Sequence, residues 1–448
     1  MPEIHNWNSS AFSQPAEVVR PRSMAELIEV VQGTLAREDR PKLRAVGHVH
    51  SMNECFGTSG VHIDMTALNG CTVDPAQGVI VAEAGATLLD IARALGPSLQ
   101  IPVMPEIGNA TAGSVACCGT KDSSVGAGPG QVSSGVVAVK MLNAQGTLED
   151  IDERHSAAEK ARLRDIRSSY GLLGVICEVT FTIEPRVVFK HEYEVLSLDP
   201  VPSLAAVRKN ADAVLAFMQP YGKQILVERR FIDSAANRSL LDHVKIQKQL
   251  RGLAWEHLAT QTVDVLTPLP FAKRFLEGFD KLTGKAFEDL LSGFRASRAD
   301  CMLDFSPNPS DPFDFTFWAY PETSWEVVVP AYLRFCQEHL PFRASLFTEV
   351  YLIAQDDKAA LSFCPSSNVF TLDSVDHRQS DPGWHQFNRD YNDLAAQLGG
   401  RPLLNQTKQL SKTVVTRTFG PRWDSFRQLV AAEDPNGRFG NSFFDALL

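Results

Sequence analysis

The residues best suited to chemistry near the N-terminus lie in one short segment, RAVGHVHSMN at positions 44–53. A short apolar run precedes it, which predicts a loop after a strand. Its glycine, serine and successive backbone N–H groups suit a tight loop around a pyrophosphate. His48 and His50 stand two residues apart and would share one face of an extended segment, so a metal pair is an alternative. An ordinary Gly–Ser turn is a third interpretation.

A nicotinamide dinucleotide site would require GxGxxG between a strand and a helix, with an acidic residue about 20 positions later. The Gly-rich candidate at 126–130, GAGPG, follows a polar serine run. It carries Pro129 where backbone would have to approach a phosphate. The pattern therefore argues against a Rossmann-type site.

Bulk composition narrows the class of protein further. The 448 residues predict two or three structural units, and the formal net charge is −10. This charge disfavours nucleic acid as a partner. The first residues lack a signal-peptide pattern, and no stretch approaches the roughly 20 apolar residues of a membrane span. Eight scattered cysteines without CxxC pairs favour reduced thiols and a cytoplasmic location.

Periodicity predicts elements that place these segments. Helices are expected at 24–35, capped by Ser23 and Glu26, and from Thr87, capped with Asp90. Longer helical stretches are expected in the middle of the chain, at 204–218 and 271–294. Strands are expected at 42–46, 61–65, 78–84, 136–142, 176–183, 314–320 and 346–353. The apolar tail at 443–448 is expected to dock on the protein.

The segment at 44–53 resembles the first FAD-binding loop of the vanillyl-alcohol oxidase superfamily, also called the PCMH-type FAD fold. Three more stretches resemble the family in the same order: 81–88 (VAEAGATL), 108–120 (GNATAGSVACCGT) and 169–176 (SYGLLGVI). In the branch of aldonolactone and alditol oxidases, the histidine at the position of His50 bonds covalently to a methyl carbon of the flavin. The resemblance thus implies FAD bound covalently through His50. The other cofactor-binding residues that it implies are Ala45, Gly47, His48, Val49, Ser51, Met52, Gly113, Ser114, Cys118, Gly119, Thr120, Gly171, Gly174, Val175 and Ile176.

Two departures from the family bear on the flavin. Related bicovalent enzymes carry a cysteine close to the position of Asn109, so a single covalent bond is expected here. Cys117 and Cys118 are interpreted as buried small side chains rather than flavin ligands. Lys121 follows the second loop where relatives often have histidine, and it is expected to alter the surroundings of the flavin.

The resemblance also implies catalytic residues. Alcohol oxidation needs a hydride acceptor, a group that takes the hydroxyl proton, and positive charge near the flavin. Glu349 resembles the glutamate of the alditol oxidase site, and Tyr351 stands where relatives have arginine. Lys408 resembles a lysine that the C-terminal segment contributes. The plain alternatives are a solvated strand residue, a core aromatic and a surface charge.

The sequence therefore predicts an α+β protein with two domains. Residues 1–189 form a PCMH-type FAD domain, residues 190–399 a substrate-binding cap, and residues 400–448 return to the FAD domain. The expected function is oxidation of a CH–OH group of a polyol, sugar or aldonolactone-like substrate. The hydride passes to covalent FAD, and oxygen is the expected acceptor. A tailoring oxidase acting on a larger apolar molecule is the alternative, and a flavin-binding protein without activity is a third.

Overall fold

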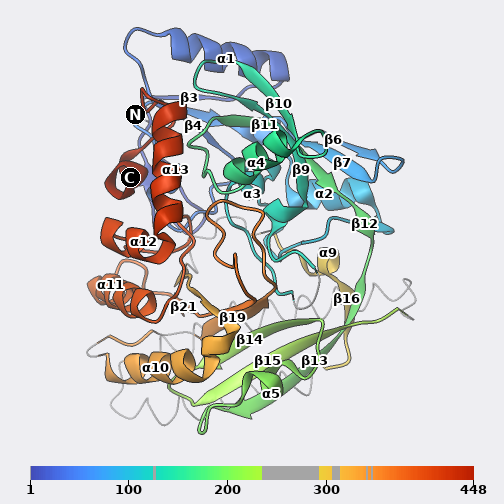
Figure 1. Cartoon of the computed structure of the whole chain (residues 1–448), viewed down its shortest axis with the longest axis vertical. Coiled ribbons are helices and arrows are strands. Elements are labelled where there is room, and N and C mark those ends of the chain that lie inside the picture. Colours follow the sequence, from blue (N-terminus) through green and yellow to red (C-terminus); the bar gives the residue numbers. More distant parts are fainter. Residues whose placement is uncertain (1, 125–127, 235–291, 305–312, 340–341, 345–346) are drawn as a thin grey trace.

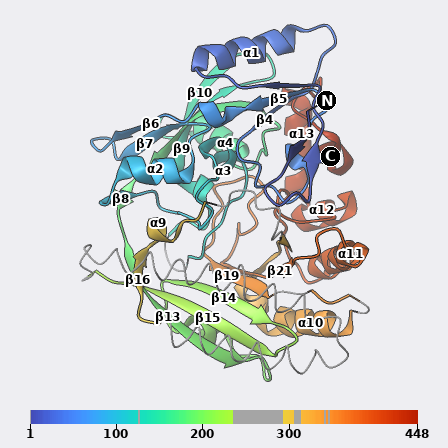
Figure 2. The same cartoon turned by 180° about the vertical axis from the view of Figure 1, so that it is seen from behind.

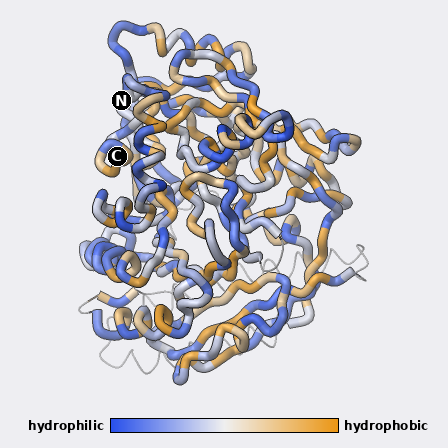
Figure 3. The backbone as a smooth tube through the Cα atoms, viewed as in Figure 1, coloured by the Kyte–Doolittle hydropathy of each residue, from blue (hydrophilic) through white to orange (hydrophobic). Residues whose placement is uncertain are grey.

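Two large antiparallel sheets, one in each domain, frame the structure (Figure 1). The computed structural model describes residues 2–124, 128–234, 292–304, 313–339, 342–344 and 347–448. Figure 3 shows apolar segments along the strands of both sheets, in keeping with their buried side chains. The expected α+β fold with two domains is confirmed.

The first layer of the N-terminal domain, which is expected to bind FAD and is called the FAD domain below, is a small parallel sheet in the order β3-β5-β4. It comprises β3 (Glu17–Val19), β4 (Leu43–Val46) and β5 (Val61–Asp64). Helix α1 (Met24–Ala36) connects β3 to β4, as strands of one parallel sheet require. Its residues Leu27 and Val31 are buried in the domain core. Because β4 lies at the edge of this sheet, the segment that follows it is free to form a loop facing the second layer.

The second layer is a five-stranded antiparallel sheet in the order β10-β9-β11-β7-β6. Thr87 and Asp90 form the reciprocal capping box expected at the start of its helix α2. The strands are β6 (Cys71–Asp74), β7 (Val79–Glu83), β9 (Val136–Leu142), β10 (Leu148–Asp152) and β11 (Val175–Thr182). The helices are α2 (Leu88–Leu95), α3 (Ala112–Cys117) and α4 (Ala157–Ile166). Short strands pair at the edges of the domain: β1 (Ile4–His5) with β2 (Phe12–Ser13), and β8 (Leu99–Gln100) with β12 (Glu184–Pro185).

The cap domain contains a nine-stranded sheet whose main path is β16-β13-β15-β14-β19-β20-β18, with β21 beside β19 and β17 beside β21. Its strands are β13 (Val188–Ser197), β14 (Ala213–Gln219), β15 (Gln224–Ile232), β16 (Arg295–Ser297), β17 (Asp314–Thr316), β18 (Ala319–Pro321), β19 (Thr348–Ile353), β20 (Val369–Thr371) and β21 (Asp373–Asp376). Its helices are α5 (Leu204–Arg208), α9 (Arg298–Cys301), α10 (Trp325–Glu338) and α11 (Pro382–Gln397). Apolar residues of α10 and α11 pack in one core with alternate residues of β14, including Val214 and Met218.

The helix expected over 204–218 is wrong. Helix α5 ends at Arg208, Lys209 adopts a left-handed backbone with φ 43°, and Ala213–Gln219 forms β14. This strand lies in the middle of the sheet and is buried on both faces, so its apolar residues are nearly continuous. Such a run has no period that separates helix from strand. Most of the helix expected at 271–294 lies outside the described residues, and 314–320 forms two short strands.

The C-terminal segment packs against the FAD domain, as Figure 2 shows from behind. It contains α12 (Lys412–Phe419), α13 (Pro421–Glu433) and α14 (Ser442–Leu447). The N–H of Leu43 in β4 donates to the carbonyl of Arg438 over 2.7 Å. The Arg438 guanidinium donates to backbone carbonyls at the end of α1 and before β4. Across the described ranges, every helix is too short or too polar to cross a membrane.

Candidate cofactor cleft and active site

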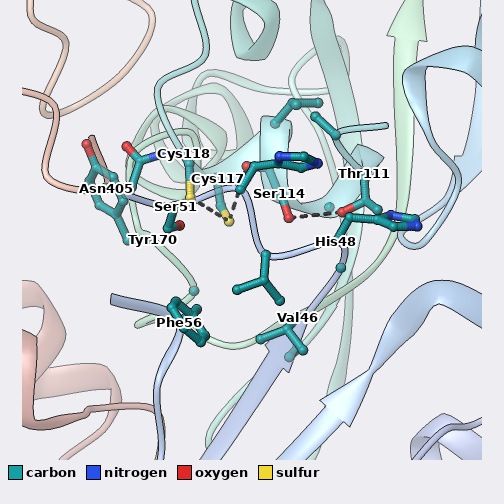
Figure 4. A pocket seen from close by; sticks show the side chains of 18 of the residues that line it. Val46, His48, Ser51, Phe56, Thr111, Ser114, Cys117, Cys118, Tyr170 and Asn405 are labelled. Atoms are coloured by element: carbon teal, nitrogen blue, oxygen red, sulfur yellow. Dashed lines mark hydrogen bonds between the residues drawn. The ribbon is translucent and has the colours of Figure 1, made fainter. Parts of the chain in front are cut away.

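A cleft in the FAD domain contains about 1010 Å³ of open space, part of it continuous with solvent (Figure 4). Most of its lining comes from four segments: β4 with the loop after it, helix α3, the turn before β11 and the loop at 405–406. The residues that line it are Arg44, Ala45, Val46, Gly47, His48, Val49, His50, Ser51, Cys55, Phe56, Met65, Ala84, Ile107, Ala110, Thr111, Gly113, Ser114, Val115, Cys117, Cys118, Thr120, Tyr170, Gly171, Gly174, Ile176, Asn405 and Gln406.

The loop after β4 is held by the N-terminal segment. Val49 adopts a left-handed backbone with φ 52°, which is unusual for a β-branched residue. The N–H of Trp7 donates to the carbonyl of Val49 over 3.1 Å, and the amide of Asn6 donates to the carbonyl of Ser51 over 2.9 Å. The turn at Val49 means that His48 and His50 do not lie along an extended strand. In the described part of the chain, no three His, Cys, Asp or Glu side chains form a metal-binding group.

The imidazole of His50 lines the cleft with both ring nitrogens buried and without a hydrogen bond of ordinary geometry. The pKa of His50 is lowered to about 4, mainly by burial and secondly by the nearby charge of His48, while Asn109 and Asp304 oppose the shift. The ring is therefore neutral at neutral pH. A neutral imidazole nitrogen keeps the lone pair that is needed to bond to carbon.

Close approach of the backbone sets the shape of the cleft. A Cβ on Gly47 would lie 2.2 Å from Oγ1 of Thr111, so only glycine lets the loop after β4 approach α3. Thr111 and Ser114 share a hydrogen bond of 2.9 Å at the start of that helix. On the opposite wall, Tyr170 and Gly171 both have positive φ, at 51° and 75°. Successive left-handed residues turn the chain sharply and direct backbone groups toward the cleft.

The polar groups of the cleft fit FAD. The side-chain oxygens of Asn405 and Gln406 are buried without a hydrogen-bond partner, and both residues line the cleft. The lining residues include no aspartate or glutamate, and their hydroxyls and amides are neutral. The positive side chain of Arg44 is occupied by the carbonyls of Tyr170 and Phe439. An elongated ligand with two phosphates and donor groups would thus meet acceptors without like-charge repulsion.

Most of the expected cofactor residues line the cleft. Met52, Gly119 and Val175 are the exceptions, since they are buried behind the walls. The sequence motifs missed Ile107, which directly precedes the second loop, and five further residues: Cys55, Phe56, Met65, Asn405 and Gln406. No recurring pattern marks those five, because three of them lie in 3-10 turns after strands and two in a loop far along the chain. The expected residues that do line it are Ala45, Gly47, His48, Val49, His50, Ser51, Gly113, Ser114, Cys118, Thr120, Gly171, Gly174 and Ile176.

Glu349 and Tyr351 lie on the same face of β19, and the Tyr351 hydroxyl donates to Oε2 of Glu349 over 3.2 Å. Burial raises the pKa of Glu349 to about 7. Lys121 opposes this shift, and the negative charges of Asp373 and Glu106 add to it. Burial also raises the pKa of Tyr351 well above its ordinary value. The pair therefore offers a carboxyl that titrates near neutrality and a phenol that stays protonated.

Two loops connect the cleft to this face of the cap. Ile107 lines the cleft, while its neighbour Glu106 binds Arg230 of β15 over 3.2 Å. Thr120 likewise lines the cleft, while its neighbour Lys121 binds Asp373 of β21 over 2.9 Å. Glu349 pairs with Asp373 across the strands β19 and β21. The charged face of the cap thus borders the cofactor cleft through adjacent residues of the same loops.

Lys408 lies in a different environment. Its ammonium is 3.1 Å from Oδ2 of Asp314 and 3.1 Å from Oγ of Ser10. Asp314 also accepts from the indole of Trp384 over 2.9 Å. The lysine whose ammonium contacts the Tyr351 ring is Lys121, with Nζ 4.4 Å from the ring centre. The expected catalytic role of Lys408 stays a prediction.

Fold and cleft together define a flavoprotein whose FAD domain is of the PCMH type. Residues 15–152 match the sequence family described as FAD binding domain, and residues 316–447 match the family described as D-arabinono-1,4-lactone oxidase. These two regions together make up more than half of the chain. The chain belongs to the vanillyl-alcohol oxidase superfamily, in its aldonolactone oxidase branch.

Individual relatives agree with this assignment. The chain is 34% identical over 191 residues to an L-gulono-1,4-lactone dehydrogenase of Mycobacterium tuberculosis, a match that spans 40% of each protein. It is 21% identical over 460 residues to an L-gulonolactone oxidase of Scyliorhinus torazame, covering 99% of this chain and 97% of that protein. A crystal structure of cholesterol oxidase from B. sterolicum has the same fold, with a TM-score of 0.77 at 15% identity over 100% of this chain and 96% of that one.

Proposed function

We propose that this protein holds FAD covalently through His50 and oxidises a CH–OH group of a neutral polar substrate. The observation that carries the proposal is the pair of Glu349 and Tyr351, placed on the cap face that borders the cleft. A carboxyl with a pKa of about 7 accepts a hydroxyl proton and releases it again near neutral pH. This pair of cap residues would supply the proton transfer that the cofactor cleft alone does not provide.

The residues that would hold FAD are those of the cleft. The neutral ring of His50 supports a single covalent bond, because its nitrogens are buried and have no hydrogen bond of ordinary geometry. The loop at 44–51 and the turn at 169–174 would surround the pyrophosphate with backbone groups. Bound FAD supplies the acceptor for the two electrons and the hydrogen that leave the substrate carbon.

The residues of the cap would manage the substrate. Glu349 takes the proton of the substrate hydroxyl, and Tyr351 holds the carboxylate through its own hydroxyl. In the overall reaction a secondary alcohol loses two electrons and two protons and becomes a ketone. Dioxygen, the proposed acceptor, takes up the same two electrons and two protons and becomes hydrogen peroxide, so atoms and electrons balance.

The relatives favour sugar-derived lactones as substrates. Their names refer to L-gulono-1,4-lactone and D-arabinono-1,4-lactone. A second candidate is a larger apolar alcohol, because Tyr193, Leu215, Phe217 and Leu226 form a buried apolar cluster that Tyr351 joins. Tyr351 thus contacts this apolar cluster with its ring and Glu349 with its hydroxyl.

The first experiment is a visible spectrum of the purified protein before and after acid precipitation. Flavin that stays in the pellet on a peptide containing His50 is the expected result. The second experiment measures peroxide release with L-gulono-1,4-lactone, D-arabinono-1,4-lactone and cholesterol. Release with a lactone supports the first candidate, and release with cholesterol alone supports the second. A protein without flavin that also fails to take up added FAD would refute the proposal.

A further inference from the structure

Lys121 is a buried cation at the boundary between the cleft and the cap. Its side chain is 8% exposed, and its ammonium is 2.9 Å from the carboxylate of Asp373, which is fully buried. The ammonium also lies over three aromatic rings: 4.4 Å from the centre of Tyr351, 5.0 Å from Phe317 and 5.9 Å from Phe315. A desolvated ammonium over aromatic faces is held in place by the ring quadrupoles.

Lys121 and Glu349 both contact the side chain of Tyr351. The ammonium lies over the Tyr351 ring, and the Tyr351 hydroxyl donates to Glu349. Asp373 contacts Lys121 and pairs with Glu349 across the sheet. These four residues come from three elements: Lys121 from the loop after α3, Glu349 and Tyr351 from strand β19, and Asp373 from strand β21. Their meeting point depends on the docking of the FAD domain on the cap.

Two other buried cations of the described part of the cap, Arg230 and Arg298, bind carboxylates other than Glu349. Arg230 binds Glu228 over 2.7 Å, and it also contacts Glu106 and Asp122. Arg298 binds Asp122. Among the charges with the largest effect on Glu349, Lys121 is the cation.

We propose that Lys121 is a positioning residue that favours the carboxylate form of Glu349 and so sets the lower pH limit of the reaction. This inference rests on the proposed function of Glu349 as proton acceptor. The groups that face Glu349 are Lys121, Asp373, Glu106 and Tyr351. Two of them are anions that favour protonation of the carboxyl, and Lys121 is the cation that opposes them. Without Lys121, Glu349 would hold its proton at neutral pH and could not take another from the substrate.

The test is direct titration of the Glu349 carboxyl by infrared difference spectroscopy on the holoprotein. The Glu349→Gln variant identifies its carbonyl band. Lys121→Met should move the midpoint upward by about one pH unit, a tenfold change in proton affinity, because the opposing positive charge is lost. Lys121→Arg should keep the midpoint near that of the wild type. Asp373→Asn should move it downward, since an anion is lost.

Matched variants guard against a merely structural effect. Lys140→Met removes another paired lysine, which binds Glu178 over 2.7 Å on the distant sheet of the FAD domain. It should leave the midpoint unchanged. If Lys121→Met does not fold because Asp373 is left buried without a partner, the double variant Lys121→Met with Asp373→Asn replaces it. That variant should still show an upward shift, since Lys121 acts on Glu349 more strongly than Asp373 does.

An unchanged midpoint in folded Lys121→Met, or in the double variant, would overturn the inference. The acid limb of kcat/KM should move with the carboxyl midpoint in each variant, and a limb that stays fixed would also overturn it. The infrared titration needs no substrate. Absence of peroxide with every alcohol, together with the expected infrared shifts, would therefore refute the proposed function and leave the control of Glu349 by Lys121 intact.

Discussion

The cofactor cleft and the charged face of the cap are neighbours, but they differ in the kinds of residue that form them. The cleft is lined by apolar side chains, glycines, hydroxyls and amides, its Arg44 is bound to backbone carbonyls, and its histidine at position 50 is neutral. The cap face contains Glu349 and Asp373, and Lys121 reaches it from the FAD domain. Dinucleotide binding depends on shape and neutral hydrogen bonds, whereas proton transfer depends on fixed charges with little water. Changes in one region should therefore alter binding, and changes in the other should alter chemistry.

The largest effect is expected from Glu349→Gln. Loss of the proton acceptor should lower kcat/KM by roughly 10²- to 10⁴-fold. Activity of the wild type should rise with pH through about 7, because the carboxylate is the active form and forms above its pKa. Steady-state kinetics between pH 5 and 9 measure both effects. Flavin content should match the wild type, and its loss would break the separation of the two regions.

His50→Ala should remove all covalent flavin, since no other side chain is expected to form that bond. Acid precipitation followed by absorbance of pellet and supernatant measures this directly. Dissociable FAD should still bind through the remaining walls of the cleft. His48→Ala is the matched control and should keep flavin in the pellet. Covalent flavin in the His50 variant would contradict the attachment site.

Gly47→Ala tests the cleft alone, through the stability of the protein and its affinity for FAD. The added Cβ would lie 2.2 Å from Oγ1 of Thr111, so α3 or the loop after β4 must shift. We expect a loss of about 1–3 kcal/mol in the free energy of unfolding and weaker FAD binding. Urea unfolding measures the first. The control is Gly33→Ala in α1, where a Cβ meets nothing within 4 Å, and which should stabilise by about 0.5–1 kcal/mol.

The smallest effect is a pH-dependent gain in stability from Glu349→Gln. The pKa of Glu349 is raised on folding, so the native state favours the protonated form, and wild-type stability falls as pH rises from about 4.5 to about 7. Glutamine has no such dependence. The variant should therefore melt about 2 °C above the wild type at pH 8 and close to it at pH 4.5. If the melting temperatures of variant and wild type differed by the same amount at pH 4.5 and at pH 8, the carboxyl of Glu349 would not titrate between these pH values.

The sequence predicts more of the cofactor cleft than of the charged face of the cap. The loop at 44–51 and the turn before β11 are contiguous motifs, so their residues could be named before the fold was known. Asn405 and Gln406 enter the cleft only through tertiary packing: Asn53 donates to the carbonyl of Leu404 over 2.7 Å, and the Met52 N–H donates to that of Asn405 over 2.8 Å. No local pattern encodes such contacts.

On the charged face of the cap, too, contacts between residues far apart in the sequence could not be predicted. Glu349 and Tyr351 can be paired from sequence because they share one strand face at i and i+2. The resemblance assigns Lys408 to the active site, and that role stays a prediction, since its ammonium binds Asp314. The contact of Lys121 with the ring of Tyr351 was not predicted. A lysine carries no sign of which distant carboxylate it will bind. Periodicity misses the strand β14 for a related reason, since burial on both faces removes its alternation.

The seam between β4 and the C-terminal segment has a consequence for biosynthesis. The guanidinium of Arg44, at the base of the flavin loop, donates to the carbonyl of Phe439 across 395 residues of chain. Nearby, Leu43 and Lys42 bind the same segment through Arg438 and Asp445. During translation the ribosome makes 395 residues of chain between Arg44 and Phe439. The wall of the cleft at β4 is therefore completed only after the cap has been synthesised, and FAD binding that depends on this wall is expected to follow synthesis of the cap.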